Sequence, residues 1–360
     1  MAKRKKASKK TPPGELTPVQ ERLIQSAVDI VESPEPNEVL FQHSVLCQTI
    51  LPYRDPGDDV RRWVQQQGAV ALMIEAGTVL HPDAEFSVRS FNQNLVELGL
   101  PYGAAARLIL VHINSEAVRK QSPVVEVEDS MTSFIKRLGL PTTGRYIRNV
   151  KDQIARLAAA RITFAFKVNG EARTINLKSD IVKGFDLWWP KNEEQRVLWP
   201  STVRLDDAYF NNLVHHAVPL DERAVAALSH NCMALDVYVW LAQRLHRIRP
   251  NRSDFVSWVN LWHQFGPNYS EVRYFRRAFR GALKQVLLQY PAARHAIQEA
   301  KGQGATSAAG LRLHHASPPV ARTTIHVSRP EQARPSPGDK RLSAAARSDK
   351  GWLRDPKKNG

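Results

Sequence analysis

The sequence has little of what marks several protein classes. Of its 360 residues only two are cysteines, Cys47 and Cys232, which is too few for a disulfide scaffold or a four-thiolate zinc site. No apolar run reaches the roughly 18 residues that a membrane-spanning helix needs. The lysine-rich start is followed by Thr11-Pro12-Pro13-Gly14, where a signal peptide would be apolar. We therefore expect a soluble, cytoplasmic protein with no membrane partner.

Motifs that carry catalysis are also missing. Gly139 and Gly144 have the glycine spacing of a phosphate loop, but the required lysine followed by serine or threonine is absent. The pairs His215-His216 and His314-His315 are adjacent in the sequence, which does not suit joint binding of one metal ion. Neither a His-x-His motif with a nearby tyrosine nor a nuclease-like group of carboxylates is found. We expect no enzyme, no cofactor and no metal site; a relaxase or primase-like protein is the disfavoured alternative among enzymes.

The net charge of +16 comes mostly from the two ends of the chain. Residues 1–12 hold six lysines and arginines and no acid, and residues 316–360 hold ten against four acids. Both ends are rich in Lys, Pro, Ser and Ala without apolar periodicity, a composition typical of disorder. We expect basic disordered tails over residues 1–15 and 317–360, whose charge can attract phosphates without reading sequence.

The first half of the remaining chain predicts helices followed by a hairpin. Thr17-Pro18 starts a first helix, residues 104–118 form another, and extended segments are expected near 70–80 and 85–91. An apolar helical face ends at Gly139, and a second helix follows Gly144. The faces consist of Met131, Phe134, Ile135 and Leu138, and of Ile147, Val150, Ile154 and Leu157.

Alternating apolar residues then predict two paired strands. Ile162, Phe164, Phe166 and Val168 precede Asn169-Gly170, the favoured two-residue hairpin turn. That turn places Phe164 opposite Ile175 and Ile162 opposite Leu177, so both strands bury one face. Helix, tight turn, helix and hairpin is the order of a winged helix.

A similar order recurs in the second half. Helices are expected over 206–216 and 234–247, and a helical face is formed by Phe255, Val259, Trp262 and Phe265. Gly266-Pro267 ends that helix, and Ser270 can cap the next one, which stops at Tyr290. Residues 311–314 are a wing strand without a visible partner. We expect a mainly α fold with small β-hairpins (α+β): tandem winged-helix domains over 16–190, including an N-terminal extension, and over 191–316.

The last long helix of each half carries a row of polar residues. In the second half five cations at helical spacing lie within a wedge of about 100°: Arg273, Arg276, Arg277, Arg280 and Lys284. In the first half the same spacing recurs 128 residues earlier: Arg145, Arg148, Asn149, Asp152 and Arg156.

Most charged rows are solvated surface, but five cations without an acid repel one another, and arginine suits contacts to phosphates and bases. We predict that the second helix is the main DNA reader. The first is the weaker one, because Asp152 interrupts its row, and the hairpin cations Lys167 and Arg173 assist it.

Nine short segments, in order over residues 40–320, resemble the plasmid-encoded RepA replication initiators of Gram-negative bacteria. The chain departs from that family at residues 104–106, 126–129 and 141–144, beside the first row. The segments are Leu51-Pro52-Tyr53-Arg54-Asp55-Pro56, Leu100-Pro101-Tyr102-Gly103, Ser115-Glu116-Ala117, Phe134 to Leu140, Leu187-Trp188-Trp189, Val218-Pro219-Leu220-Asp221, Leu235 to Leu241, Phe265-Gly266 and Tyr269.

The resemblance implies a bacterial protein that binds repeated sequences in double-stranded plasmid origin DNA, helps to open the origin and recruits host replication proteins. It implies no catalysis. By analogy it also suggests a homodimer that represses its own gene. A plasmid-encoded winged-helix transcriptional repressor is the alternative from the binding class.

Overall fold

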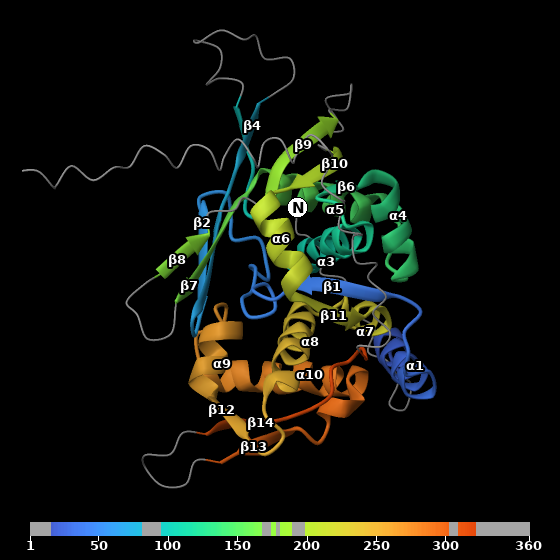
Figure 1. Cartoon of the computed structure of the whole chain (residues 1–360), viewed down its shortest axis with the longest axis vertical. Coiled ribbons are helices and arrows are strands. Elements are labelled where there is room, and N and C mark those ends of the chain that lie inside the picture. Colours follow the sequence, from blue (N-terminus) through green and yellow to red (C-terminus); the bar gives the residue numbers. More distant parts are fainter. Residues whose placement is uncertain are drawn as a thin grey trace, which may run out of the picture. The chain divides into compact units, whose positions relative to one another are not determined.

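Helices and strands are both spread along the whole described chain (Figure 1). The computed structural model describes residues 16–80, 95–167, 174–177, 181–188, 199–301 and 309–321. Within these residues the strands form five small sheets. The α+β class is confirmed, with more sheet than the predicted hairpins alone would give.

The first half begins with a well-capped helix. Thr17 and Gln20 form a capping box, and Pro18 occupies the first turn, as the sequence predicts. Gly139, with a φ of +63°, follows the helix of residues 128–137. The elements are α1 (Pro18–Glu32), β1 (Val39–His43), β2 (Arg62–Gln67), β3 (Val70–Glu75), β4 (Thr78–Leu80), β5 (Leu95–Glu97), α3 (Gly103–Lys120), β6 (Val124–Glu126), α4 (Glu128–Arg137), α5 (Gly144–Ala159), β7 (Arg161–Lys167), β8 (Thr174–Leu177), β9 (Val182–Trp188) and β10 (Trp199–Leu205).

The second half starts with a helix capped by Asp206 and leads into the long helix that carries the cationic row. Its elements are α6 (Asp207–His216), β11 (Ala217–Asp221), α7 (Glu222–Leu228), α8 (Cys232–Arg244), η3 (Leu245–Arg247), β12 (Ser253–Ser257), α9 (Trp258–Phe265), α10 (Val272–Gln289), η4 (Pro291–Ala293), β13 (Ile297–Ala300) and β14 (Gly310–His314).

Two local predictions in the second half are wrong. Phe255 belongs to strand β12 and is 44% exposed, and the buried face of α9 is formed by Trp258, Leu261 and Phe265. The spacing of Phe255 and Val259 imitates a helical face across a strand–helix boundary. The N-cap of α10 is Glu271 rather than Ser270, and its side chain makes no capping hydrogen bond.

The two halves repeat one order of elements. Helix, strand, helix, helix and two strands run as α3, β6, α4, α5, β9, β10 and as α8, β12, α9, α10, β13, β14, with β7 and β8 inserted after α5 in the first half. Their sheets have the same strand order, β6-β10-β9 and β12-β14-β13. Helices α5 and α10 start 128 residues apart, at Gly144 and Val272. Strand β14 thus has two partners, β12 and β13, that the sequence did not reveal.

The predicted hairpin belongs to another sheet, of order β2-β3-β7-β8. The predicted register is wrong by two residues, because Phe164 pairs with Leu177 and Phe166 with Ile175. A shift of two residues keeps the same residues on one face of the strand pair. Asn169-Gly170 lies outside the described residues, as does the extended segment predicted near 85–91.

Strands β1 and β11, in the corresponding place of each half, join the halves. They pair antiparallel about Phe41 and Pro219, as equivalent strands related by a local two-fold axis would. The preceding helices are exchanged: α1 packs on α7 and α10 of the second half, and α6 packs on α3 and β1 of the first (Figure 1). All described residues fall in one compact unit, and the domain boundary near residue 190 stays a prediction.

A buried ion pair lies where α3 meets α8. Arg107 Nε and a terminal nitrogen each donate to Asp236 at 2.8 Å, and both side chains are under a tenth exposed. The remaining guanidinium contacts go to the carbonyl oxygens of Leu51, Pro52 and Gly103. Burial raises the pKa of Asp236, and the charge of Arg107 opposes that rise. Arg107 and Asp236 hold equivalent positions, the fifth residue of α3 and of α8.

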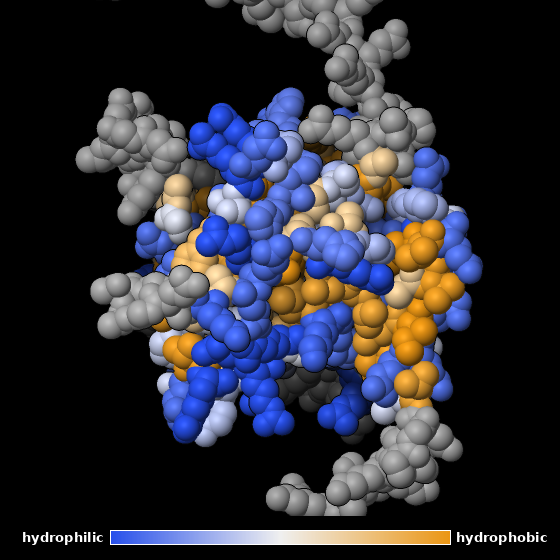
Figure 2. Space-filling model, turned by 90° about the horizontal axis from the view of Figure 1, so that it is seen from below, coloured by the Kyte–Doolittle hydropathy of each residue, from blue (hydrophilic) through white to orange (hydrophobic). Residues whose placement is uncertain are grey.

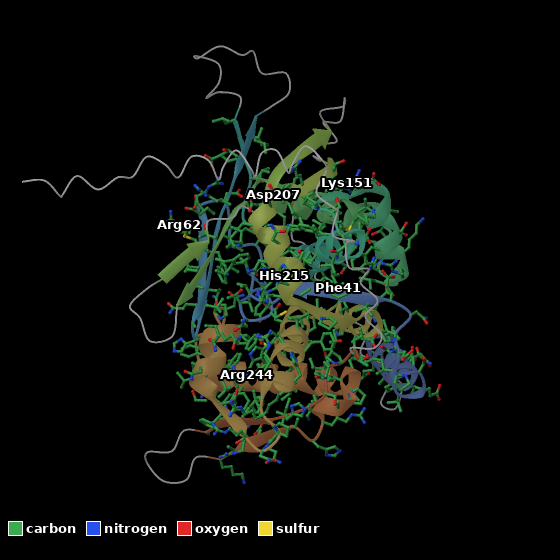
Figure 3. All side chains as sticks on the ribbon, viewed as in Figure 1. Phe41, Arg62, Lys151, Asp207, His215 and Arg244 are labelled. Atoms are coloured by element: carbon green, nitrogen blue, oxygen red, sulfur yellow. The ribbon has the colours of Figure 1, made fainter. Side chains whose placement is uncertain are left out.

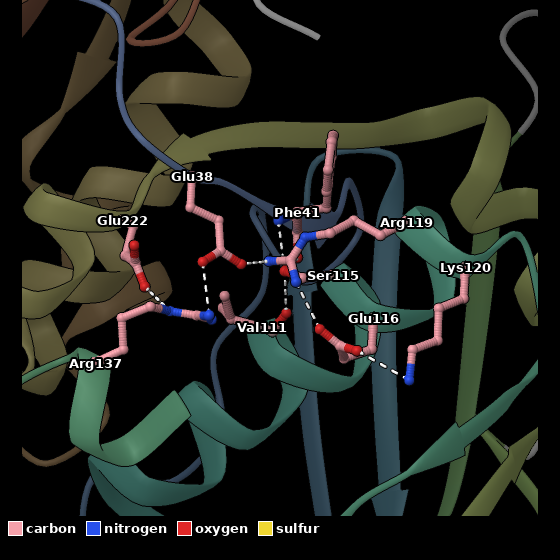
Figure 4. Close-up of polar contacts among 9 residues, drawn as sticks. All are labelled: Glu38, Phe41, Val111, Ser115, Glu116, Arg119, Lys120, Arg137 and Glu222. Carbon is pink, nitrogen blue, oxygen red and sulfur yellow. Dashed lines mark hydrogen bonds and ion pairs between the residues drawn. The ribbon is translucent and has the colours of Figure 1, made fainter. Parts of the chain in front are cut away.

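A second set of ion pairs crosses the same junction nearer to the surface (Figure 4). Glu38, before β1, contacts Arg119 of α3 and pairs with Arg137 of α4 at 2.7 Å. Arg137 also pairs with Glu222, the first residue of α7. Since Glu222 belongs to the second half, this chain of charges ties α4 to α7.

Candidate nucleic-acid interface

Helix α10 has one buried face and one polar face, as its periodicity predicts. The buried side chains are Phe275, Phe279, Ala282, Leu283 and Val286. The rings of Phe275 and Phe279 lie 5.4 Å apart, and Phe279 meets Trp258 edge-on at 5.8 Å. This packing fixes the rotation of α10, so the row of cations faces outward.

Acids from neighbouring elements pair with two cations of the row. Arg273 Nε lies 2.7 Å from Glu271, and Arg280 donates twice to Glu299 of β13, at 2.6 and 2.8 Å. The hydrogen bonds from Arg280 lower the pKa of Glu299, so that acid is charged at neutral pH. The row itself contains no acid, but Glu271 and Glu299 partly neutralise its charge. The periodicity of the α10 sequence does not reveal these contacts.

A tryptophan supports the middle of the row. The guanidinium carbons of Arg276 and Arg280 lie 5.1 and 5.4 Å from the centre of the Trp258 ring, the distance range of cation–π contacts. Trp258 is only 4% exposed and so belongs to the core. Sequence reasoning missed its second role as a platform for arginines.

Arg277 and Lys284 are the free members of the row. Both are exposed, and neither forms an ion pair or hydrogen bond within the described residues. They are therefore the row's most available donors for phosphate or base atoms. Figure 2 shows hydrophilic residues over much of this side of the molecule and hydrophobic residues in its centre and at its right. On α1, Ile24, Val28 and Val31 are 45%, 40% and 57% exposed.

The row on α5 splits into an outer and an inner part. Arg145, Arg148 and Asn149 are exposed in the first turns after the Thr143 cap. Arg148 makes only a 3.4 Å hydrogen bond to the Gly144 carbonyl oxygen. Lys151, next along the helix, is half-buried (Figure 3).

Arg156 is turned into the body of the protein. Its Nε donates to Asp152 at 2.9 Å, a terminal nitrogen donates to the Leu100 carbonyl oxygen at 3.3 Å, and the guanidinium lies over the Tyr102 ring at 5.2 Å. A Cβ at Gly99 would stand 2.2 Å from this guanidinium. The structure thus does not bring Arg156 together with the outer cations of α5.

The two hairpin cations cannot be placed at a site. Lys167 ends strand β7, and Arg173 lies outside the described residues. In the part of the chain that is described, no group of three or more His, Cys, Asp or Glu residues is arranged to hold a metal ion. None of the helices described there is both long and apolar enough to cross a membrane.

We compared the chain with known protein families, curated proteins and solved structures. The sequence model of the plasmid-encoded RepA protein family matches residues 100–264. No curated protein matches the chain significantly.

Solved structures give weaker similarity. A crystal structure of selenomethionine derivatives of domains 2 and 3 of RctB covers 77% of this chain and 99% of its own, at 10% identity and a TM-score of 0.45. A crystal structure of RctB domains 2–3 covers 76% and 97%, at 9% and 0.43. Similarity at this level does not establish a shared fold.

The family match extends from the residues before α3 into α9, and so spans parts of both repeats. It confirms the resemblance predicted from the sequence: residues 100–264 of the chain match the family of plasmid-encoded RepA proteins.

Proposed function

We propose that this chain initiates plasmid replication by binding repeated origin sequences through two winged-helix units, over residues 16–190 and 191–316, with α1 and α6 exchanged between them. The repeated order of elements supports the two units. In each, a strand precedes a pair of helices, and a later two-stranded element completes a three-stranded sheet. In the first unit β9 and β10 correspond to β13 and β14, so we propose the β9–β10 strand pair as the wing.

The exposed row on α10 is the observation that carries the proposal. In a helix-turn-helix unit the second helix enters the major groove, and α10 is the second helix after β12. Arg277 and Lys284 offer free charges, and Trp258 holds Arg276 and Arg280 in place. Arginine donors in fixed positions suit bidentate contacts to guanine and to phosphate.

Helix α5 is proposed as the weaker reader of a second groove face, through Arg145, Arg148 and Asn149. The contacts of Arg156 favour a supporting role for it, and Lys167 and Arg173 are proposed to meet a flanking backbone. The tails of residues 1–15 and 317–360 add sequence-independent attraction.

We further propose that bound protein helps to open the origin and recruits host replication proteins, in the bacterial cytoplasm and without catalysis of its own. Autorepression as a homodimer is a separate proposal.

A replication assay tests the function directly. A plasmid carrying only this gene and its flanking DNA should be maintained in a host that does not support the vector alone. The R277A variant should lower maintenance, and the R62A variant, which changes an exposed arginine on β2, should not. If the replicon fails while the protein still represses its own promoter, it is a transcriptional repressor.

A further inference from the structure

A second group of arginines lines a hollow that the row on α10 does not reach. It follows helix α8 and has a volume of about 340 Å³. We call it the arginine pocket; it is lined mainly by Gln48, Arg244, Arg247, Arg249, Arg252 and Asp254. Arg244 is labelled in Figure 3.

The charges of the arginine pocket are unbalanced. Arg244 pairs with Asp254 at 3.1 Å, and the buried Arg244 Nε has no hydrogen-bond partner among the described residues. Arg247, Arg249 and Arg252 are exposed and form no ion pair there. Four guanidinium groups thus share one carboxylate.

The backbone presents two of these arginines together. Arg252 N–H donates to the Arg249 carbonyl oxygen at 2.9 Å, which closes a four-residue turn with Pro250 in its second position. Proline fixes the backbone there, and the ends of such a turn lie within about 7 Å. Buried Ile248 anchors the turn, because its carbonyl oxygen accepts from His315 Nδ1 at 2.8 Å.

Stabilisation of a helix end explains only part of the cluster. Cations near a helix C-terminus are favourable, which accounts for Arg244 and Arg247 at the end of α8. Arg249 and Arg252 lie beyond that turn. They keep an unpaired charge that repels its neighbours.

The first repeat makes the contrast clear. Arg119 lies in the last turn of α3, as Arg244 lies in the last turn of α8. Arg119 contacts both Glu38 and Glu116 (Figure 4). The first repeat thus neutralises the arginine at the end of its helix, whereas the second leaves Arg247, Arg249 and Arg252 without an ion pair among the described residues.

We propose that the arginine pocket binds backbone phosphates of DNA, as a sequence-independent contact additional to the reading helices. The inference rests on the proposed DNA binding and extends it to a surface outside α10. Clustered guanidinium groups complement phosphates through paired hydrogen bonds. Since its partners are phosphates alone, this contact strengthens binding to every sequence equally.

The test compares two variants with the same loss of charge. R249A/R252A removes the two turn arginines, and R62A/R294A removes two exposed arginines elsewhere. Full-length proteins are titrated with an origin duplex and a random duplex at several salt concentrations. We expect R249A/R252A to flatten the slope of log K against log salt by about 1–2, since each phosphate contact contributes about 0.9. Its preference for the origin duplex should be unchanged.

Other outcomes are equally informative. If the salt slope of R249A/R252A equals that of R62A/R294A, the arginine pocket does not contact DNA. A different result would also overturn the proposed contact: the wild type binds adenosine triphosphate and R249A/R252A does not, while both proteins bind DNA with the same affinity. R249Q/R252Q, checked by thermal unfolding, excludes a folding defect. A wild type without preference for the origin duplex would refute the proposed function, while the salt slopes on random duplex still decide the pocket.

Discussion

The two halves of the chain share an order of elements and differ in what covers their last long helix. Over the C-terminal part of α5, Val79 and Ala155 form an apolar cluster with Val96, Leu98 and Ala159. Strands β4 and β5, which have no counterpart before α8, supply this cover. Among the described residues no such strands cover the polar face of α10, and Lys284 is exposed there.

Equal spacing therefore does not mean equal exposure. Arg156 and Lys284 occupy matching places in the two rows. Arg156 is bound by Asp152 and Leu100, whereas Lys284 is free among the described residues. Only the first turns of α5 can meet a ligand, while α10 offers its polar face over most of its length.

The largest effect should come from breaking the ion pair that joins the halves. R107A leaves Asp236 buried and unpaired, which should lower the free energy of unfolding by about 3–5 kcal/mol. Chemical denaturation followed by fluorescence and circular dichroism measures this. An apolar double variant, R107M/D236L, should recover most of the loss. If instead R107A leaves one half fully stable, the halves fold independently and the pair is a local feature.

The reading helices should respond unequally to loss of a cation. R277A should weaken binding to the origin repeat by about 1–3 kcal/mol and relax preference at particular base pairs. The matched variant R145A on α5 should cost less and act evenly across sequences. Titrations on a set of single-base variants of the repeat measure both effects. The reverse pattern would make α5 the main reader.

Acid should weaken the first half through two buried histidines. Burial lowers the pKa of His43 to about 4 and that of His112 to about 3. Above the ordinary pKa of about 6.5 both histidines are neutral in the folded and in the unfolded chain, so they do not reduce the free energy of unfolding. As the pH falls below that value, only the unfolded chain binds protons, so each histidine should cost about 2 kcal/mol between pH 7 and pH 5.

Denaturation at the two pH values measures this loss, and H112Q should remove about half of it. Hydrogen exchange should report faster opening in β1 and α3 than in α8 at pH 5. Equal acceleration in both halves would contradict this assignment.

The smallest effect should come from Arg156. R156A removes contacts to Asp152, Leu100 and Tyr102, and should lower the free energy of unfolding by about 1 kcal/mol. The salt slope of DNA binding should not change, because the side chain faces inward. If R156A flattens the salt slope as much as R145A does, Arg156 contacts DNA.

Local sequence signals predicted the helices well and the pairing of strands poorly. The cap at Thr17, the stop at Gly139 and the buried face of α10 depend on residues a few positions apart, which periodicity captures. The partners of β14 could not be found, because Ile297–Ala300 has too little apolar alternation to mark a strand. The observed register of β7 and β8 is not the one that a two-residue turn at Asn169-Gly170 would set.

In the candidate site, too, local features could be predicted from the sequence and tertiary contacts could not. Rotation of α10 followed from Phe275 and Phe279, but the pairing of Arg280 with Glu299 depends on a strand that had not been recognised. The inward position of Arg156 depends on residues 95–102, far from it in the sequence. Contacts of this kind are set by tertiary packing and leave no local pattern.

The ion pair of Arg107 and Asp236 also limits how the two halves can assemble. In a symmetric dimer of one repeat, equivalent residues beside the axis would be identical. Arginine would face arginine, or aspartate would face aspartate, in a buried place where like charges repel. A complementary pair at these positions requires two halves of different sequence. Because one half carries the arginine and the other the aspartate, neither half can pair with a copy of itself at this surface without burying like charges.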